Sequence, residues 1–234
     1  MSYLRLRRAQ FIFACFLVSS ILFIEFPAID LGISRMLFDD GFYLGGAWSV
    51  LAHESVLYFL ECSLLLAAGV YGFNRIFGRS LFGIDGKKVT YLLLVLVLGA
   101  GLVVNGIFKD DFGRARPRDI EQFGGSNHFT PAFVVSHECD RNCSFSSGDG
   151  AGAFFAVALA LALGRKRAML LAALAYGVIV SFSRVASGAH FFSDSVVSFF
   201  VMLISADVLY HYLLLPARER TPAARWRTST ALAE

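Results

Sequence analysis

The sequence predicts an all-α membrane protein, a bundle of six transmembrane helices. Of its 234 residues, 56% are hydrophobic and only 17% are charged, whereas charged residues make up about a quarter of a soluble domain. The mean hydropathy is +0.62, and apolar runs near the ~20 residues that cross a bilayer recur along the chain. This composition excludes a disordered chain, a secreted disulfide scaffold and an ordinary soluble enzyme. The scattered basic residues indicate no nucleic-acid partner.

Six apolar runs are the expected spans: 11–28, 56–74, 89–108, 148–164, 168–184 and 195–215. The first run follows three arginines, as a signal peptide would, but a clean small-residue cleavage site is missing, so we expect a membrane anchor. The chain is expected to form one domain over 1–234. The core covers 56–215, and 216–234 is a cytoplasmic tail.

The basic residues predict the orientation. The two termini and the loops at 75–88 and 164–167 hold 14 of the 21 lysines and arginines. The positive-inside rule therefore places both termini in the cytoplasm and the loops 29–55, 109–147 and 185–194 outside. Several cations nevertheless crowd against span ends on the outer side, which suggests that these charges have a function there.

Two cysteines of the outer loop form a candidate disulfide. Cys139 and Cys143 lie in a short polar segment, where ring closure is easy if the compartment is oxidising. A zinc site is the alternative, but two cysteines without a second pair are a weak metal signal. We therefore favour the disulfide and expect no metal.

Two polar clusters at the expected outer span ends are candidate anion-binding sites. Lys109 and Arg116 flank six residues after the third run, where an ammonium and a planar guanidinium can hold the oxygens of one anion. A charge cluster neutralised by its own aspartates is equally consistent. Ser147, Gly148 and Asp149 open the fourth run, where helix N–H groups attract anions. Taken alone, this segment is more simply an ordinary N-cap with an acidic first turn.

The third cluster contains a histidine and a carboxylate. His190 and Asp194 are four residues apart, so on a helix they share a face, and a carboxylate on one ring nitrogen leaves the other free as a nucleophile. Arg184 precedes them. A polar helix end with an unrelated arginine is the alternative, but a His–Asp pair with an arginine at a membrane boundary favours function. All three clusters fall on one side of the membrane, and together they supply what phosphoryl transfer requires.

These residues resemble the type 2 phosphatidic acid phosphatase family of integral-membrane lipid phosphatases. The pattern Lys-x6-Arg-Pro occurs over 109–117, and Ser-Arg-x5-His-x3-Asp occurs over 183–194. The resemblance implies a six-helix core with the site at the periplasmic ends of spans three to six. It also implies that His190 attacks phosphorus and that Asp194 holds and polarises His190. The implied phosphate-binding residues are Lys109, Arg116, Ser147, Gly148 and Arg184.

The second family motif, Pro-Ser-Gly-His, departs here, because Asp149 replaces the histidine thought to protonate the leaving oxygen. Asp149 can act as that acid only if its pKa is raised. His128 or His137 from the same loop is an alternative, and a substrate with a good leaving group needs little acid help. With an acidic residue at this position, the sequence resembles relatives of lipid A phosphatases from Gram-negative bacteria.

The expected function is dephosphorylation of a membrane lipid phosphate or pyrophosphate through a phosphohistidine, without metal or cofactor. The expected location is a bacterial inner membrane, with the site facing the periplasm. Candidate substrates are lipid A, phosphatidylglycerol phosphate, phosphatidic acid and an isoprenoid pyrophosphate, with lipid A slightly favoured. A lipid phosphotransferase and a non-catalytic lipid-phosphate-binding protein are the alternatives. Related haloperoxidases are soluble, and a transporter would carry charges along a mid-membrane path. The oligomeric state is not indicated.

Overall fold

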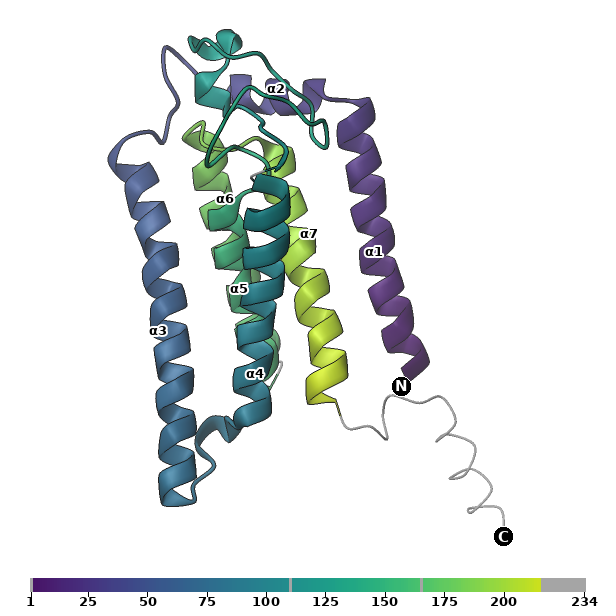
Figure 1. Cartoon of the computed structure of the whole chain (residues 1–234), viewed down its shortest axis with the longest axis vertical. Coiled ribbons are helices and arrows are strands. Elements are labelled where there is room, and N and C mark those ends of the chain that lie inside the picture. The colour runs from purple at the N-terminus through teal and green to yellow at the C-terminus, as the bar shows by residue number, and fades with distance from the viewer. Residues whose placement is uncertain (1, 110, 165, 216–234) are drawn as a thin grey trace.

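The structure is a computed structural model that describes residues 2–109, 111–164 and 166–215. Within these residues every regular element is helical, which confirms the predicted all-α class. The expected cytoplasmic tail over 216–234 lies outside the described residues. Figure 1 shows long helices side by side, with the N-terminus and the end of α7 at the same end of the molecule.

The main helices are α1 (Ser2–Glu25), α2 (Ala28–Met36), α3 (Ala47–Phe77), α4 (Gly86–Leu94) with its π-helical continuation η2 (Val95–Lys109), α5 (Gly148–Ala162), α6 (Arg167–Ala186) and α7 (Phe192–Leu209) with η5 (Tyr210–Leu214). Short 3₁₀ turns occupy Leu81–Gly83, Pro117–Asp119 and Glu121–Phe123. The predicted spans coincide with these helices, apart from their ends.

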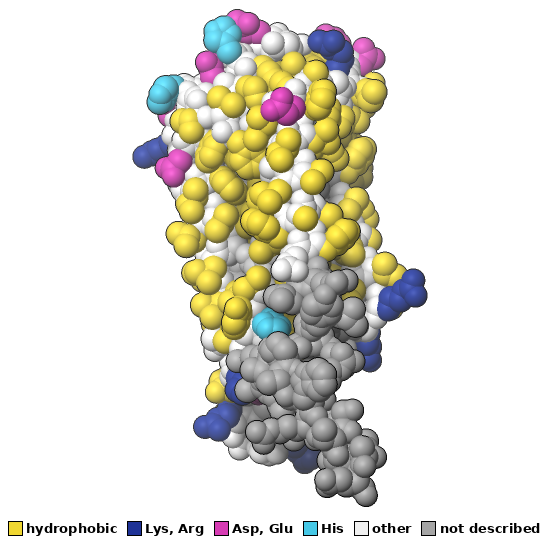
Figure 2. All heavy atoms as spheres, turned by 90° about the vertical axis from the view of Figure 1, so that its right-hand side faces the viewer, with side chains coloured by type: hydrophobic (Ala, Val, Ile, Leu, Met, Phe, Trp, Pro, Cys, Tyr) yellow, Lys and Arg dark blue, Asp and Glu magenta, His cyan; other side chains and the backbone are white. Residues whose placement is uncertain are grey.

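Among the described residues, four helices are long and apolar enough to cross a membrane, and a fifth crossing results if the bent pair α1 and α2 counts as one span. The remaining helix, α5, has only 15 residues, or about 22 Å at 1.5 Å per residue, less than the ~30 Å of a hydrocarbon core. Six spans therefore stay a prediction. Figure 2 shows hydrophobic side chains over the middle of one face and charged side chains towards its two ends, as is typical of a membrane protein.

Helix α5 lies inside the bundle, where most of its residues are buried. Glycines bring it close to its neighbours. A Cβ on Gly152 would lie 2.5 Å from Val56 of α3, and one on Gly177 of α6 would lie 2.2 Å from Phe154 of α5. Small residues at such contacts let apolar helices approach closely. These contacts fix α5 against its two neighbouring helices.

The predicted outer loop 29–55 is wrong in two places. The chain bends by 85° between α1 and α2, at Pro27, which has no N–H to continue the α1 hydrogen-bond ladder. Helix α2 then crosses the end of the bundle (Figure 1) and buries Asp30. Helix α3 begins at Ala47 rather than at 56, because polar His53 and Glu54 interrupt the apolar pattern without interrupting the helix.

Candidate functional site

His190 lies in the turn between α6 and α7 and is almost fully buried. Its Nδ1 atom is 2.8 Å from the carbonyl oxygen of Ser144. A carbonyl oxygen only accepts hydrogen bonds, so Nδ1 carries the proton and Nε2 of the neutral ring has the lone pair. The contact thus fixes the tautomer in which Nε2 can act as a nucleophile.

Asp194 acts on His190 through Ser144 rather than by the expected direct hydrogen bond. Its Oδ2 atom is 3.7 Å from His190 Nδ1, too far for a good hydrogen bond. The same oxygen accepts the Ser144 hydroxyl at 2.5 Å and the Phe191 N–H at 2.8 Å. Asp194 therefore holds the segment whose carbonyl orients the imidazole, and its negative charge remains close to the ring.

Arg114, to which sequence analysis assigned no role, anchors Asp194. Its guanidinium is 1% exposed and donates to Asp194 Oδ1 at 2.5 Å and to Asp30 Oδ2 at 2.8 Å. It also lies 4.1 Å from the Phe191 ring centroid, a favourable cation–π distance. Asp30 accepts further bonds from the hydroxyl and N–H of Ser193. This buried network joins α2, the outer loop and α7.

The predicted cations gather near His190. Burial and the positive charges of Arg116 and Lys109 lower the pKa of His190 to about 4, with Asp194 acting in the opposite direction. Lys109 stands at the start of α5, since a Cβ on Gly148 would lie 3.3 Å from its Nζ. Burial and the charges of Arg118 and Arg184 lower the pKa of Arg116. The concentration of positive charge around a buried imidazole is what a phosphate anion requires.

The N-terminus of α5 adds the positive end of a helix dipole to this cluster. Ser147 is the N-cap, and its hydroxyl accepts the Gly150 N–H at 3.1 Å, as is usual at a helix start. Its own N–H donates to the Asp194 carbonyl oxygen at 3.3 Å. The positive end of the α5 dipole therefore faces the region of His190 and Lys109.

Asp149, expected as a substitute acid, lies between two nitrogen donors. Its Oδ1 is 2.7 Å from His53 Nδ1, and its Oδ2 is 2.9 Å from Arg184 Nε, an ion pair without hydrogen-bond alignment. Sequence analysis missed His53, because it lies 96 residues from its partner and on another helix. The alternative His128 is exposed and faces Glu121 at 3.4 Å, and His137 is also exposed.

Cys139 and Cys143 are joined as a disulfide in the structure. The bond closes a small loop that contains Asn142. The carbonyl oxygen of Asn142 accepts a hydrogen bond from Arg116 Nη2 at 2.7 Å. The loop ends next to Ser144, the residue that binds His190. The disulfide thus restrains two groups that position site residues, and the oxidising compartment stays a prediction.

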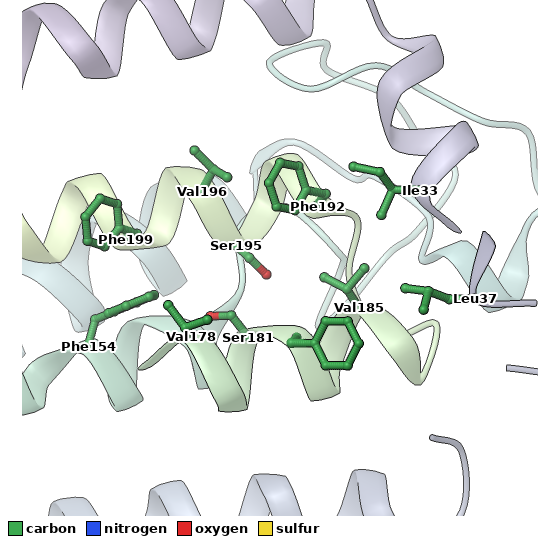
Figure 3. Close-up of a pocket in the computed structure, with 11 residues that line it drawn as sticks. Ile33, Leu37, Phe154, Val178, Ser181, Val185, Phe192, Ser195, Val196 and Phe199 are labelled. Carbon is green, nitrogen blue, oxygen red and sulfur yellow. The ribbon is translucent and has the colours of Figure 1, made fainter. Parts of the chain in front are cut away.

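An apolar cavity of about 390 Å³ lies beside the site, between α2, α5, α6 and α7 (Figure 3). Val185, Phe192 and Ser195 line it and are the direct chain neighbours of Arg184, Phe191 and Asp194. The buried hydroxyls of Ser181 and Ser195 also line it, and neither has a hydrogen-bond partner among the described residues. The cavity is therefore lined by the same chain segments that carry the site residues.

The lowered pKa of His190 predicts a pH-dependent stability. The unfolded histidine has a pKa of about 6.5, and the folded one about 4. The unfolded state therefore binds the proton first, and stability present above pH ~6.5 is lost as the pH falls towards 4. Between pH 7 and pH 5 the loss from His190 is about 2 kcal/mol. We expect the Tm in detergent to fall further for the wild type than for His190→Gln. Parallel Tm profiles would contradict this.

The fold and the site define a helical membrane protein with a buried histidine surrounded by cationic side chains at one end of its bundle. The chain belongs to the PAP2 superfamily, whose family model matches residues 90–216, just over half of the sequence. The resemblance inferred from the motifs is thereby confirmed. His53 and Asp30 lie outside the matched segment, which is a further reason why motif reasoning did not find them.

Three curated relatives are lipid A 4'-phosphatases. The protein of Francisella tularensis subsp. novicida (strain U112) is 41% identical over 127 residues, covering 53% of this chain and 57% of that protein. The Rhizobium leguminosarum protein is 33% identical over 120 residues, 50% of this chain and 52% of that protein. The Rhizobium etli protein is 34% identical over 110 residues, 46% and 43% of the two chains. The chain spans about half the length of these relatives. No solved structure matches it.

Proposed function

We propose that this protein is a lipid phosphatase that removes phosphate through a phosphohistidine on His190. The observation that carries the proposal is the hydrogen bond from His190 Nδ1 to the Ser144 carbonyl, which leaves Nε2 as the nucleophilic nitrogen of a buried, neutral imidazole. Nε2 attacks phosphorus, the bond to the lipid oxygen breaks, and water then attacks the phosphohistidine to release inorganic phosphate.

Binding of the phosphoryl group is assigned to the groups around His190. The charges of Lys109, Arg116 and Arg184 neutralise the equatorial oxygens in the transition state. Ser147 and Gly148 contribute the amide end of α5. The proximity of these cations supports the assignment. Partly buried like charges such as Arg116 and Arg184 repel each other, and a bound phosphoryl anion would offset this repulsion.

The phosphate of lipid A is the substrate that we favour. The curated relatives carry the name lipid A 4'-phosphatase, and the segment that matches the family model contains the three motifs. The excess of basic residues at the ends and loops expected inside supports a bacterial inner-membrane location with the site facing the periplasm. The common position of the N-terminus and the end of α7 in Figure 1 is consistent with six crossings.

The function is tested by phosphate release from detergent-purified protein with EDTA present. The panel contains lipid A, phosphatidylglycerol phosphate, phosphatidic acid and an isoprenoid pyrophosphate. We expect release from lipid A to exceed release from the others. If another lipid is preferred, the substrate assignment is wrong. If no lipid releases phosphate while the protein remains folded, the hydrolase assignment itself fails, and a transfer assay with a second lipid becomes the next experiment.

The apolar cavity predicts where an acyl chain of the substrate lies. Val178 and its neighbour Ile179 are both exposed, but only Val178 lines the cavity. We expect Val178→Trp to raise the KM for a long-chain lipid phosphate roughly tenfold, because about two methylene groups lose apolar contact at ~0.8 kcal/mol each. A short-chain analogue should be unaffected, as should both substrates in Ile179→Trp. Equal changes for the long and short chains would contradict the assignment.

A further inference from the structure

The first two turns of α3 lie against the site, although they are far from the site motifs in sequence. Ser49 and His53 are four residues apart and so share one helix face. Arg184 Nη1 donates hydrogen bonds to the carbonyl and hydroxyl oxygens of Ser49, at 2.8 and 2.7 Å. His53 Nδ1 meets Asp149 Oδ1 at 2.7 Å. Two separate contacts therefore hold this helix end, and with it the His53 ring, at the phosphate cluster.

Asp149 is poorly suited to be the acid itself. Each of its oxygens faces a nitrogen donor, His53 on one side and Arg184 on the other, and opposite charge and hydrogen bonding favour the ionised carboxylate. An ionised carboxylate only accepts protons. Asp149, which replaces the family histidine, is therefore arranged to orient His53.

His53 has the geometry that proton donation requires. Because Nδ1 is bound to Asp149, Nε2 points away from the carboxylate, and the side chain is 51% exposed. A lipid alcohol can therefore reach it. Asp149 is also close enough to His190 for the two side chains to influence each other electrostatically. The His53–Asp149 pair thus lies beside the nucleophile, with its proton-carrying nitrogen accessible.

We propose that His53 is the general acid and base of the reaction and that Asp149 positions it. This proposal rests on the proposed phosphatase function. In the first step His190 Nε2 bonds to phosphorus, the phosphorus–oxygen bond to the lipid breaks, and the proton on His53 Nε2 moves to the leaving oxygen. In the second step water adds its oxygen to phosphorus, its proton returns to His53, and the phosphorus–nitrogen bond breaks to release phosphate.

A leaving-group comparison tests the proposal. The probes are dodecyl phosphate and a dodecyl-substituted nitrophenyl phosphate, whose leaving anion needs no proton. For His53→Gln we expect kcat/KM to fall about 10²- to 10⁴-fold with dodecyl phosphate, the usual contribution of general acid catalysis, and less than about tenfold with the nitrophenyl probe. Asp149→Asn should show the same selectivity with a smaller loss. His128→Gln and His137→Gln are matched controls for the two other outer histidines.

The second step provides a readout that a structural role would not change. Without its base, His53→Gln should accumulate phosphohistidine with the nitrophenyl probe. The expected signs are a burst of nitrophenolate equal to the enzyme concentration and a phosphoprotein that is labile to acid and stable to base. Equal losses on both probes with no burst would overturn the role of His53, and selectivity in His128→Gln or His137→Gln would assign it elsewhere. If His190→Ala is as active as the wild type, the proposed function fails first.

Discussion

Replacing His190 by alanine is expected to abolish phosphate release, with kcat lowered by roughly 10⁴-fold or more, because the variant has no atom that can form the covalent intermediate. The ring is buried and its tautomer is set by the Ser144 carbonyl. The measurement is release of inorganic phosphate from the preferred lipid, combined with trapping of the phosphoenzyme from labelled substrate. The variant should yield no labelled protein.

His137→Ala is the matched control, since His137 lies exposed on the outer loop and should keep wild-type activity and labelling. Circular dichroism and thermal melting in the same detergent establish that His190→Ala remains folded. Labelled protein in His190→Ala at the wild-type level would show that another residue is the nucleophile. The phosphohistidine mechanism would then be wrong.

Replacing Arg114 by methionine is expected to destabilise the protein by about 3–5 kcal/mol, the usual cost of removing one partner from a buried ion pair. The change leaves Asp30 and Asp194 buried without their shared cation, both being at most 1% exposed. It also removes the hydrogen bond to the Thr130 carbonyl and the contact with the Phe191 ring. The measurement is the Tm of the purified variant in detergent.

Arg118→Met provides the comparison, because Arg118 is half exposed and lies 3.8 Å from a half-exposed Asp119. Surface pairs of this kind contribute at most about 1 kcal/mol, so its Tm should change little. Asp30→Asn should restore part of the stability of Arg114→Met by removing one of the unpaired charges. Similar Tm values for the two arginine variants would show that the buried network does not stabilise the fold.

Motif spacing predicted much of the candidate site. Lys109, Arg116, Arg184 and His190 stand in patterns with fixed intervals, and the structure brings them together as expected. Arg114 lies inside the first pattern, yet nothing in the spacing distinguishes it from the other cations. Only its burial between Asp30 and Asp194 reveals that it supports the site rather than facing a ligand.

Helix boundaries were predicted less well where a helix contains polar residues near its end. The start of α3 was placed about nine residues too late, since His53 and Glu54 lower the local hydropathy in the first two turns of the helix. The same misplacement concealed the helix face that carries Ser49 and His53. Hydropathy records which residues prefer lipid, whereas helix continuation depends on backbone hydrogen bonds and on packing.

The sequence by itself determined the all-α class, the membrane environment, and the motifs that place this chain in its family. These properties follow from composition, apolar run length and local spacing. Only the tertiary structure decided which residue stands beside Asp149, what anchors Asp194, and how the His190 imidazole is oriented. Those contacts join residues 96, 80 and 46 positions apart. The physical reason is that such contacts depend on how the helices and the outer loop pack, which no local pattern records.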